Sequence, residues 1–343
     1  MSLKVFITID TEEDLWGNFQ ASDNPVDNIN GIPDLQALFD RYGAVPTYLV
    51  NYPVATNDHA VHILKDILDR GHCEIGAHCH PWNTPPFEEE INQHNSMMCN
   101  LSVDLVMRKM EKLTDVIMRK FMITPKSFRA GRWGMGPGVA RSILNLGYRV
   151  DTSVSPFINW ANEDGADFRK APTRAYRFEP DNLLREQPEG SLLEVPPTIG
   201  FFQKNFRLCH ALQTILSKPP ICKLHPIGIM DRLKLLNFRW LSPELSSGPD
   251  MIRLSKNFIR KGCRFLNMSF HSTSLLPGKS PFVDTEKQLE FFFKDIELFL
   301  KFVTNQDVEF LPLSQAVDSS ILCGGESEFI NRNNPKNRRL NYG

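Results

Sequence analysis

The sequence predicts an α/β fold, a β/α barrel in which a parallel sheet is surrounded by helices. Strand-like segments alternate with helix-like segments through almost the whole chain, and such alternation favours a parallel sheet covered by helices. An open doubly wound sheet is the alternative, but it normally carries a glycine-rich first turn, and here no glycine precedes Gly17. Polar residues recur where predicted strands end, as at the active-site rim of a β/α barrel. They are Asp10, His78, Arg129, Asp151, Glu194 and His271.

The first half of the chain supplies four predicted strands and three predicted helices. The strands are short runs rich in β-branched and aromatic residues, and the helices carry apolar residues every three or four positions. The helix over 59–70, for example, is followed by Gly71, a typical C-cap. In chain order these elements are strand 4–10, helix 33–42, strand 45–50, helix 59–70, strand 73–79, helix 103–121 and strand 127–131.

The second half continues the alternation with one interruption. Its elements are helix 137–146, strands 148–153 and 192–195, helix 250–261, strand 265–271, helix 285–303 and strand 308–313. Residues 200–248 break the pattern and are predicted to form a helical insertion. Within them, 208–236 is apolar and basic but contains three prolines, so we expect an interfacial or substrate-covering segment. We expect the barrel to occupy residues 1–318 and a polar tail to occupy 319–343.

The composition is that of an ordinary globular protein, with 41% hydrophobic residues among 343 and a formal net charge of −1. Such a charge gives no general attraction to nucleic acid, so we expect no such partner. No run reaches the roughly 20 apolar residues of a membrane span, and the start lacks a signal-peptide layout. Seven cysteines form no Cys-x-x-Cys pair, which favours reduced thiols in a cytosolic setting. Attachment to the inner face of the membrane and the oligomeric state stay open.

Two histidines at the end of strand 73–79 provide the first chemical signal. Alternate residues of a strand point to the same side, so His78 and His80 are expected to direct both imidazoles at one point. A lone histidine is usually structural, but this pair with acids on another strand end favours a metal site. Zinc suits two imidazoles and a carboxylate, with water in the open position. Cys79, between them, is predicted to pack on the opposite face.

An acidic run, Asp10-Thr11-Glu12-Glu13-Asp14, follows the first strand. Asp10 and Glu12 share a face while the strand continues, so that one carboxylate would bind metal and the other would accept a proton. The alternative is an ordinary helix N-terminus, where acidic side chains are common. Taken alone, the run leaves both interpretations open.

Two further strand ends carry candidate catalytic and substrate-binding side chains. Arg129 and Arg132 lie at the end of a short strand, where an arginine can hold a carboxylate through a forked pair of bonds. A weak surface ion pair is the alternative. Trp82 and Trp133 would stack on a sugar face, with ordinary packing as an equally supported alternative. His271 ends strand 265–271 and would protonate a leaving group, although a lone histidine there would be structural.

Five motifs in this order resemble those of the polysaccharide deacetylase (NodB-homology) family of carbohydrate esterases, over about residues 3–315. They are Ile7-Thr8-Ile9-Asp10-Thr11-Glu12, Glu74-Ile75-Gly76-Ala77-His78, Phe128-Arg129-Ala130-Gly131, Val150-Asp151-Thr152-Ser153 and Ser269-Phe270-His271-Ser272. The pattern looks closest to the branch associated with bacterial lipopolysaccharide and surface-glycan biosynthesis. The resemblance implies a distorted, seven-stranded β/α barrel and a metal-dependent activity, and zinc is the divalent metal that the donor set above fits. It also implies an acetylated carbohydrate substrate, glycan-, lipid- or nucleotide-linked, that loses an N- or O-acetyl group.

The resemblance also implies roles by position. Asp10 resembles the catalytic base, Glu12 the acidic metal ligand and His78 the first histidine ligand. Arg129 resembles the residue that orients the base, and His271 resembles the general acid.

The sequence departs from the family pattern at two ligand positions. The usual second histidine lies four residues after the first, where this chain has Trp82, so His80 is the substitute. Thr11 separates the two acids that are commonly adjacent, and Glu13 or Asp14 could replace the second acid. The expected substrate-binding residues are Trp82, Trp133, Arg132, Asp151 and Glu194.

Two other functions compete with a deacetylase. Metal-dependent amidohydrolases also use a His-x-His pair, usually on the first strand of the barrel rather than the third. A sugar-binding pseudoenzyme with a weakened metal site is the second alternative. A serine hydrolase and a phosphate-loop protein are poorly supported, because the chain has neither a Gly-x-Ser-x-Gly elbow nor a Gly-x-x-x-x-Gly-Lys-Ser/Thr loop.

Overall fold

The structure, a computed structural model, describes residues 2–322, so most of the predicted tail 319–343 lies outside the described residues. Seven parallel strands follow one another across one sheet in the order β10-β1-β2-β3-β4-β5-β7. They are β1 (Leu3–Thr11), β2 (Thr47–Val50), β3 (Glu74–Cys79), β4 (Ser127–Ala130), β5 (Val150–Asp151), β7 (Leu192–Glu194) and β10 (Phe265–His271). The predicted α/β architecture with a parallel sheet is therefore confirmed.

Two more strands complete the nine-stranded sheet. β6 (Tyr176–Phe178) pairs with β7 in the antiparallel sense, and β11 (Val308–Phe310) pairs with the start of β1. No ladder joins β7 to β10 in the described part of the chain. Instead, Thr198 N–H donates to the Asn267 carbonyl (3.0 Å), and the Asn267 side-chain amide donates to the Val195 carbonyl (3.1 Å). These irregular bonds close the seven-stranded barrel on that side and make it distorted.

Alternation along β1 separates the two sides of the barrel wall. Val5, Ile7 and Ile9 belong to the large core cluster formed with the outer helices. Phe6 belongs to a smaller cluster with residues such as Val150. Because side chains of a strand alternate between faces, Thr8 and Asp10 follow Phe6 on the inner side. Apolar side chains therefore fill the barrel interior near the N-terminal ends of the strands, and polar side chains lie near the C-terminal ends.

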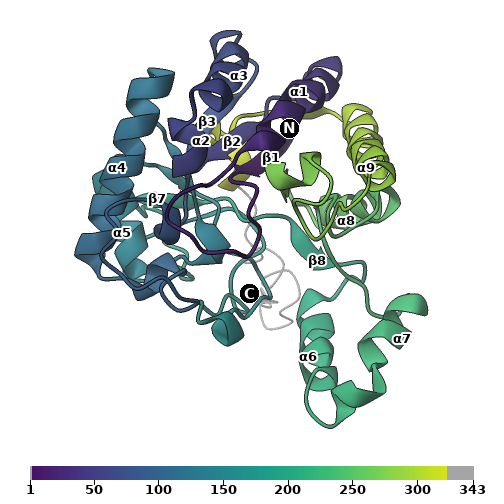
Figure 1. Cartoon of the computed structure of the whole chain (residues 1–343). Helices are drawn as coiled ribbons and strands as arrows, with labels where there is room; N and C mark the ends of the chain where they lie inside the picture. Colours follow the sequence, from purple (N-terminus) through teal and green to yellow (C-terminus); the bar gives the residue numbers. More distant parts are fainter. Residues whose placement is uncertain (1, 323–343) are drawn as a thin grey trace, which may run out of the picture.

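Helices cover the outside of the barrel (Figure 1). They are α1 (Ile32–Arg41), α2 (Tyr52–Thr56), α3 (Asp58–Asp69), α4 (Val103–Phe121), α5 (Pro137–Asn145), α8 (Gly248–Arg260) and α9 (Glu286–Thr304). Short polar side chains cap the first turns of α2, α3, α4, α8 and α9. Ser102 caps α4 by accepting from Leu105 N–H, and Thr285 forms a capping box with Gln288 on α9. Burying the apolar face of such a helix contributes about 1.5–3 kcal/mol per large side chain.

A two-stranded ribbon and two small helices occupy the predicted insertion. β8 (Ile199–Phe201) pairs with β9 (Phe238–Trp240) in the antiparallel sense. Between them, α6 (Phe206–Leu216) and α7 (Pro226–Arg232) project away from the barrel (Figure 1). No helix among residues 2–322 has both the length and the hydropathy needed to cross a bilayer.

Candidate active site

Strand register brings the chemical residues together at the C-terminal edge of the barrel. Asp10 of β1 lies opposite His271 of β10 in the ladder, and His78 of β3 lies opposite Arg129 of β4. β2 lies between β1 and β3, so the four side chains come from two pairs of adjacent strands with one strand between the pairs. Parallel strands end on the same side of a barrel, and the site therefore follows directly from the fold.

Three side chains converge on one point next to these strand ends. His78 Nε2 lies 3.2 Å and His80 Nε2 lies 3.3 Å from the same oxygen, Glu12 Oε2. The three ligand atoms all lie within 4.8 Å of one another, and the three residues are buried. Two imidazole nitrogens and one carboxylate oxygen form a typical zinc donor set. The structure thus brings together Glu12, His78 and His80, as the sequence predicts.

The outer nitrogens of both imidazoles are already occupied. His78 Nδ1 donates to the Arg129 carbonyl at 3.0 Å, and His80 Nδ1 donates to Glu13 Oε1 at 3.1 Å. Trp82 Nε1 donates to the same Glu13 oxygen at 3.3 Å. Such outer bonds orient the ring of a metal-binding histidine, and both Nε2 atoms are directed at the shared point. The sequence suggests Glu13 only as a replacement ligand. In the structure it instead binds the outer nitrogen of His80.

Close backbone approach keeps His80 in place. A Cβ on Gly131 would lie 2.4 Å from His80 Cδ2 and 2.6 Å from the Cys79 carbonyl oxygen. Only glycine fits here without a shift of the neighbouring atoms. His80 also stacks on Trp82, with ring centroids 4.2 Å apart and planes inclined by 23°.

The remaining acid of the run has a structural role. Asp14 accepts from the backbone N–H groups of Asp27 (2.9 Å) and Asn28 (3.0 Å) and so ties down the loop that follows β1. The Asn28 amide also donates to the Glu12 carbonyl at 2.9 Å. Asp14 is therefore not placed to replace Glu12 as a ligand.

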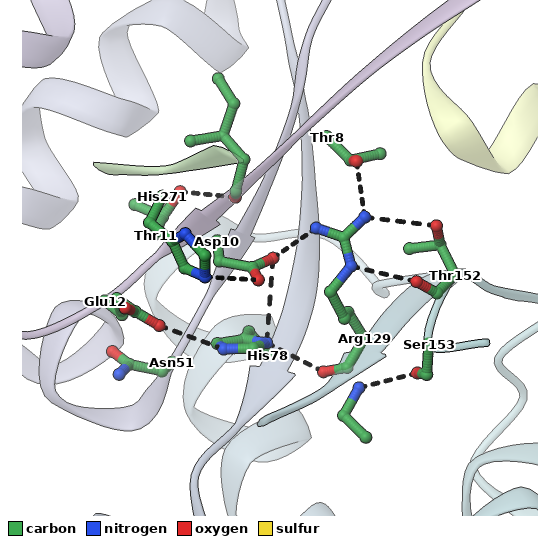
Figure 2. A network of polar contacts seen from close by, with 12 residues as sticks. Thr8, Asp10, Thr11, Glu12, Asn51, His78, Arg129, Thr152, Ser153 and His271 are labelled. Atoms are coloured by element: carbon green, nitrogen blue, oxygen red, sulfur yellow. Dashed lines mark hydrogen bonds and ion pairs between the residues drawn. The ribbon is translucent and has the colours of Figure 1, made fainter. Parts of the chain in front are cut away.

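Asp10 forms a buried ion pair with Arg129 (Figure 2). Arg129 Nη1 donates to Asp10 Oδ1 at 2.6 Å, Nη2 donates to Thr8 Oγ1 at 2.6 Å, and Nε donates to the Thr152 carbonyl at 3.0 Å. Burial opposes ionisation of Asp10, but the charges of Arg129, His78 and His271 together lower the pKa of its carboxyl. Asp10 is therefore an oriented carboxylate, 4.0 Å from His78 Nδ1.

His271 faces Asp10 on one side and an unexpected glutamate on the other. Its Nε2 lies 3.6 Å from Asp10 Oδ2, and its Nδ1 lies 2.9 Å from Glu244 Oε2. Glu244 Oε1 also accepts the backbone N–H of His271 at 3.0 Å. Burial lowers the pKa of His271, yet Glu244 and the other acids outweigh it and raise that pKa to about 9. His271 is therefore protonated at neutral pH.

The predicted substrate-binding residues separate into two groups. Arg132 and Trp133 lie half-buried beyond β4, in left-handed backbone conformation. Arg132 Nη2 donates to Glu163 Oε2 at 2.9 Å. Trp133 stacks on Trp160 and contacts Trp240 edge-on, with centroids 5.5 Å apart. Its ring also lies 5.2 Å from the Arg129 guanidinium carbon.

Trp82, Asp151 and Glu194 do not form the open rim that the sequence predicts. Trp82 is only 6% exposed, and the two acids are completely buried. Asp151 Oδ1 accepts from Ser153 Oγ (2.5 Å), and Glu194 Oε1 accepts from Val154 N–H (3.2 Å). Burial raises the pKa of both carboxyls, and that of Glu194 most strongly because Asp151 lies beside it. They form an enclosed pair within the barrel rather than a surface for substrate.

Two side chains of the site carried no clear sequence signal. Glu244 lies in the irregular segment 241–247, where no periodicity marks it. Trp16 follows the acidic run and contacts the His271 ring edge-on, with centroids 4.6 Å apart. Its exposed fraction of 41% leaves it at the mouth of the site.

The fold and the site define a class, a β/α-barrel protein with a candidate metal centre at the C-terminal edge. No family model and no curated protein matches the chain. Several solved structures are similar to it. A Mycobacterium smegmatis protein provisionally named a polysaccharide deacetylase is 15% identical, with a TM-score of 0.52 over 92% of this chain and 88% of its own. A Parabacteroides distasonis protein provisionally named a glycoside hydrolase/deacetylase is 10% identical, with a TM-score of 0.58 over 92% and 71%. The chain therefore has the fold of the polysaccharide deacetylases, as its motifs predict.

Proposed function

We propose that this chain is a metal-dependent carbohydrate deacetylase of the polysaccharide deacetylase family. The observation that carries the proposal is the convergence of Glu12, His78 and His80 on one point, next to the ion pair of Asp10 and Arg129. The shared fold supports it, because active sites of such barrels lie at this edge. The substrate is an N- or O-acetylated sugar, and the products are acetate and the free amine or hydroxyl.

The donor set supports a resident divalent metal. Glu12 Oε2 and the two Nε2 atoms would hold it, and the bonds from His78 to the Arg129 carbonyl and from His80 to Glu13 already preset both rings. We infer zinc, because two imidazoles and one carboxylate suit it with a position left for water. When bound, such an ion polarises a carbonyl and lowers the pKa of water.

The chain's own residues then move two protons. Asp10, held at Oδ1 by Arg129, accepts a proton from the attacking water. The water oxygen forms a bond to the acetyl carbon, and the bond from that carbon to the sugar nitrogen or oxygen breaks. His271, which lies across from Asp10, donates its Nε2 proton to the departing atom. Glu244, bonded to Nδ1, keeps His271 charged and oriented.

The aromatic and basic side chains beyond β4 are the proposed substrate wall. Trp133 offers a half-buried ring above Arg129, and Arg132 lies beside it. Aromatic faces and arginine forks suit sugar rings and anionic groups. On the resemblance of the five motifs, we place the substrate in bacterial surface-polysaccharide or lipopolysaccharide biosynthesis.

Metal analysis combined with acetate release tests this proposal. Protein purified without chelator is analysed for metal, then incubated with N-acetylglucosamine oligomers and with O-acetylated xylan. We expect about one metal per chain and acetate release that His78→Ala abolishes. The matched control is His62→Ala, which removes an exposed histidine of α3 and should change neither readout.

Each alternative function has its own signature in this assay. Ring opening of a cyclic amide without acetate release from either sugar would identify an amidohydrolase instead. Substoichiometric metal with sugar binding intact would identify a pseudoenzyme. Either result overturns the deacetylase.

A further inference from the structure

The segment between β8 and β9, residues 204–235, projects from the barrel as an arm (Figure 1). Its base is fixed. Phe206 packs on Phe201 and Phe258, with ring centroids 5.9 and 5.4 Å away, and the Asn257 amide donates to the Phe201 carbonyl at 2.6 Å. Apart from Phe206, only Cys209 is buried among the residues of the arm. The arm is therefore anchored at one end and exposed over the rest of its length.

Large apolar side chains gather on the exposed part of the arm. Seven of the sixteen exposed large hydrophobic residues in the described chain lie within these 32 positions. They are Leu208, Ile215, Ile221, Leu224, Ile229, Leu233 and Leu235. Leu224 is 75% exposed, and Leu233 at the C-cap of α7 lies four residues after Ile229 of that helix. Such a concentration marks an interaction site.

Basic side chains accompany the apolar ones. The arm contains Lys204, Arg207, Lys218, Lys223, Arg232 and Lys234 but only one acid. That acid, Asp231, is already paired with Arg239 at 2.7 Å. The arm has a formal charge of +5, and because the whole chain carries −1, the remaining residues together carry −6. The positive charge is therefore concentrated on the same projection that exposes the apolar side chains.

We propose that this arm docks the protein on the surface of a bilayer that contains anionic lipid. Exposed leucine and isoleucine side chains insert at the boundary between headgroups and acyl chains, while lysine and arginine attract anionic headgroups. The net negative charge of the barrel body directs the arm, rather than another face, to the membrane. Neither short helix spans the bilayer, so the attachment is peripheral and reversible.

Other occupants fit these observations less well. A nucleic acid would use the cations but leave the exposed leucines and isoleucines unexplained. A second copy docked arm against arm would bring two surfaces of charge +5 together, which is unfavourable. An anionic bilayer satisfies the apolar and the basic side chains at once.

Co-sedimentation of the full chain with vesicles tests the proposal. We expect binding to phosphatidylcholine vesicles that contain 25% phosphatidylglycerol, weaker binding at 0.5 M salt, and little binding to phosphatidylcholine alone. The variant Lys218→Ser/Lys223→Ser/Lys234→Ser should lower the partition coefficient by roughly fivefold per cation. The variant Leu224→Ser/Leu233→Ser should lower it by at least about tenfold.

Matched controls separate docking from misfolding and from self-association. Met118→Ser/Phe291→Ser removes two exposed apolar side chains outside the arm and should bind as the wild type does. Thermal unfolding verifies that every variant is folded, and sedimentation velocity reports its mass. The proposal fails if wild-type protein does not sediment with the anionic vesicles, if it binds neutral vesicles equally well, or if the arm variants bind unchanged. The proposal also fails if the wild type is a dimer that becomes a monomer only in the arm variants, because the arm would then bind a second copy of the chain.

Discussion

Glu244 holds His271 through both the imidazole and the backbone, with Oε2 2.9 Å from Nδ1 and Oε1 3.0 Å from the backbone nitrogen. The glutamate comes from the segment that follows β9, and the histidine ends β10. The insertion and the catalytic strand are thus joined at the candidate general acid. This contact makes the site depend on a part of the chain that has no regular pattern.

Replacement of that glutamate gives the first prediction. Glu244→Gln should reduce kcat by roughly 10- to 100-fold, because His271 loses orientation and charge. The pKa of His271 is raised to about 9, and a general acid must be protonated, so activity should fall as pH rises through that value. In the variant the pKa falls towards the ordinary 6.5, and the alkaline limb of the kcat/KM profile should move to lower pH. Glu111→Gln, on the surface of α4, is the control. An unchanged alkaline limb would show that Glu244 does not act through His271.

Glu13 supplies the second prediction. Glu13→Gln weakens the charged bond to His80 Nδ1, which presets that ring. Loss of such an outer partner typically lowers metal affinity 10- to 100-fold. Competition with a chromophoric chelator measures the affinity. Asp34→Asn, an exposed acid on α1, should leave the affinity as it is. Equal affinities for the Gln variant and the wild type would contradict the assigned role of Glu13.

Gly131 supplies the third prediction. Gly131→Ala places a methyl group 2.4 Å from His80 Cδ2 and 2.6 Å from the Cys79 carbonyl. Overpacking of this kind costs about 1–3 kcal/mol of unfolding free energy, and it should also weaken metal binding by displacing His80. Gly228→Ala is a matched control, because a Cβ there meets nothing within 4 Å. Urea unfolding compares the two variants. Equal unfolding free energies of the two variants relative to the wild type would contradict the role of Gly131 in holding His80.

The enclosed pair of Asp151 and Glu194 gives the fourth prediction. Burial first, and then the neighbouring Asp151, raise the pKa of Glu194 well above its ordinary value. The folded state thus keeps a proton on Glu194 that the unfolded state releases above pH 4.5. The contribution of Glu194 to the free energy of unfolding is therefore complete below that pH and declines as pH rises. Relative to Glu194→Gln, wild-type stability should fall by about 1.4 kcal/mol per pH unit. Urea unfolding from pH 5 to 8 measures the difference between the two proteins. A difference that stays constant with pH would contradict a protonated Glu194.

Strong periodicity made much of the fold predictable. Helix α4 and strand β10 begin and end at the predicted residues, 103–121 and 265–271. Each presents a long, continuous apolar pattern. β6, β8, β9 and α2 were not predicted, because each is only three to five residues long. Such short elements form through tertiary contacts, and local sequence carries little of that information.

The site could be predicted only where strand geometry decides it. His78 and His80 follow the two-residue period of a strand, and the structure brings both to Glu12. Asp151 and Glu194 also lie at strand ends, but the structure encloses them. β5 and β7 contain only two and three residues, and the segment 152–155 that follows β5 is itself completely buried. Sequence patterns do not reveal how deep a strand ends within a barrel.

The most direct measurement is anomalous diffraction at the zinc edge from crystals grown with zinc. The account predicts one strong peak per chain within about 2.0–2.2 Å of Glu12 Oε2, His78 Nε2 and His80 Nε2, with Asp10 beside it but not bonded to it. No peak at this point, or a zinc ion held by other side chains while His80 stays bonded elsewhere, would contradict the proposed centre and with it the deacetylase.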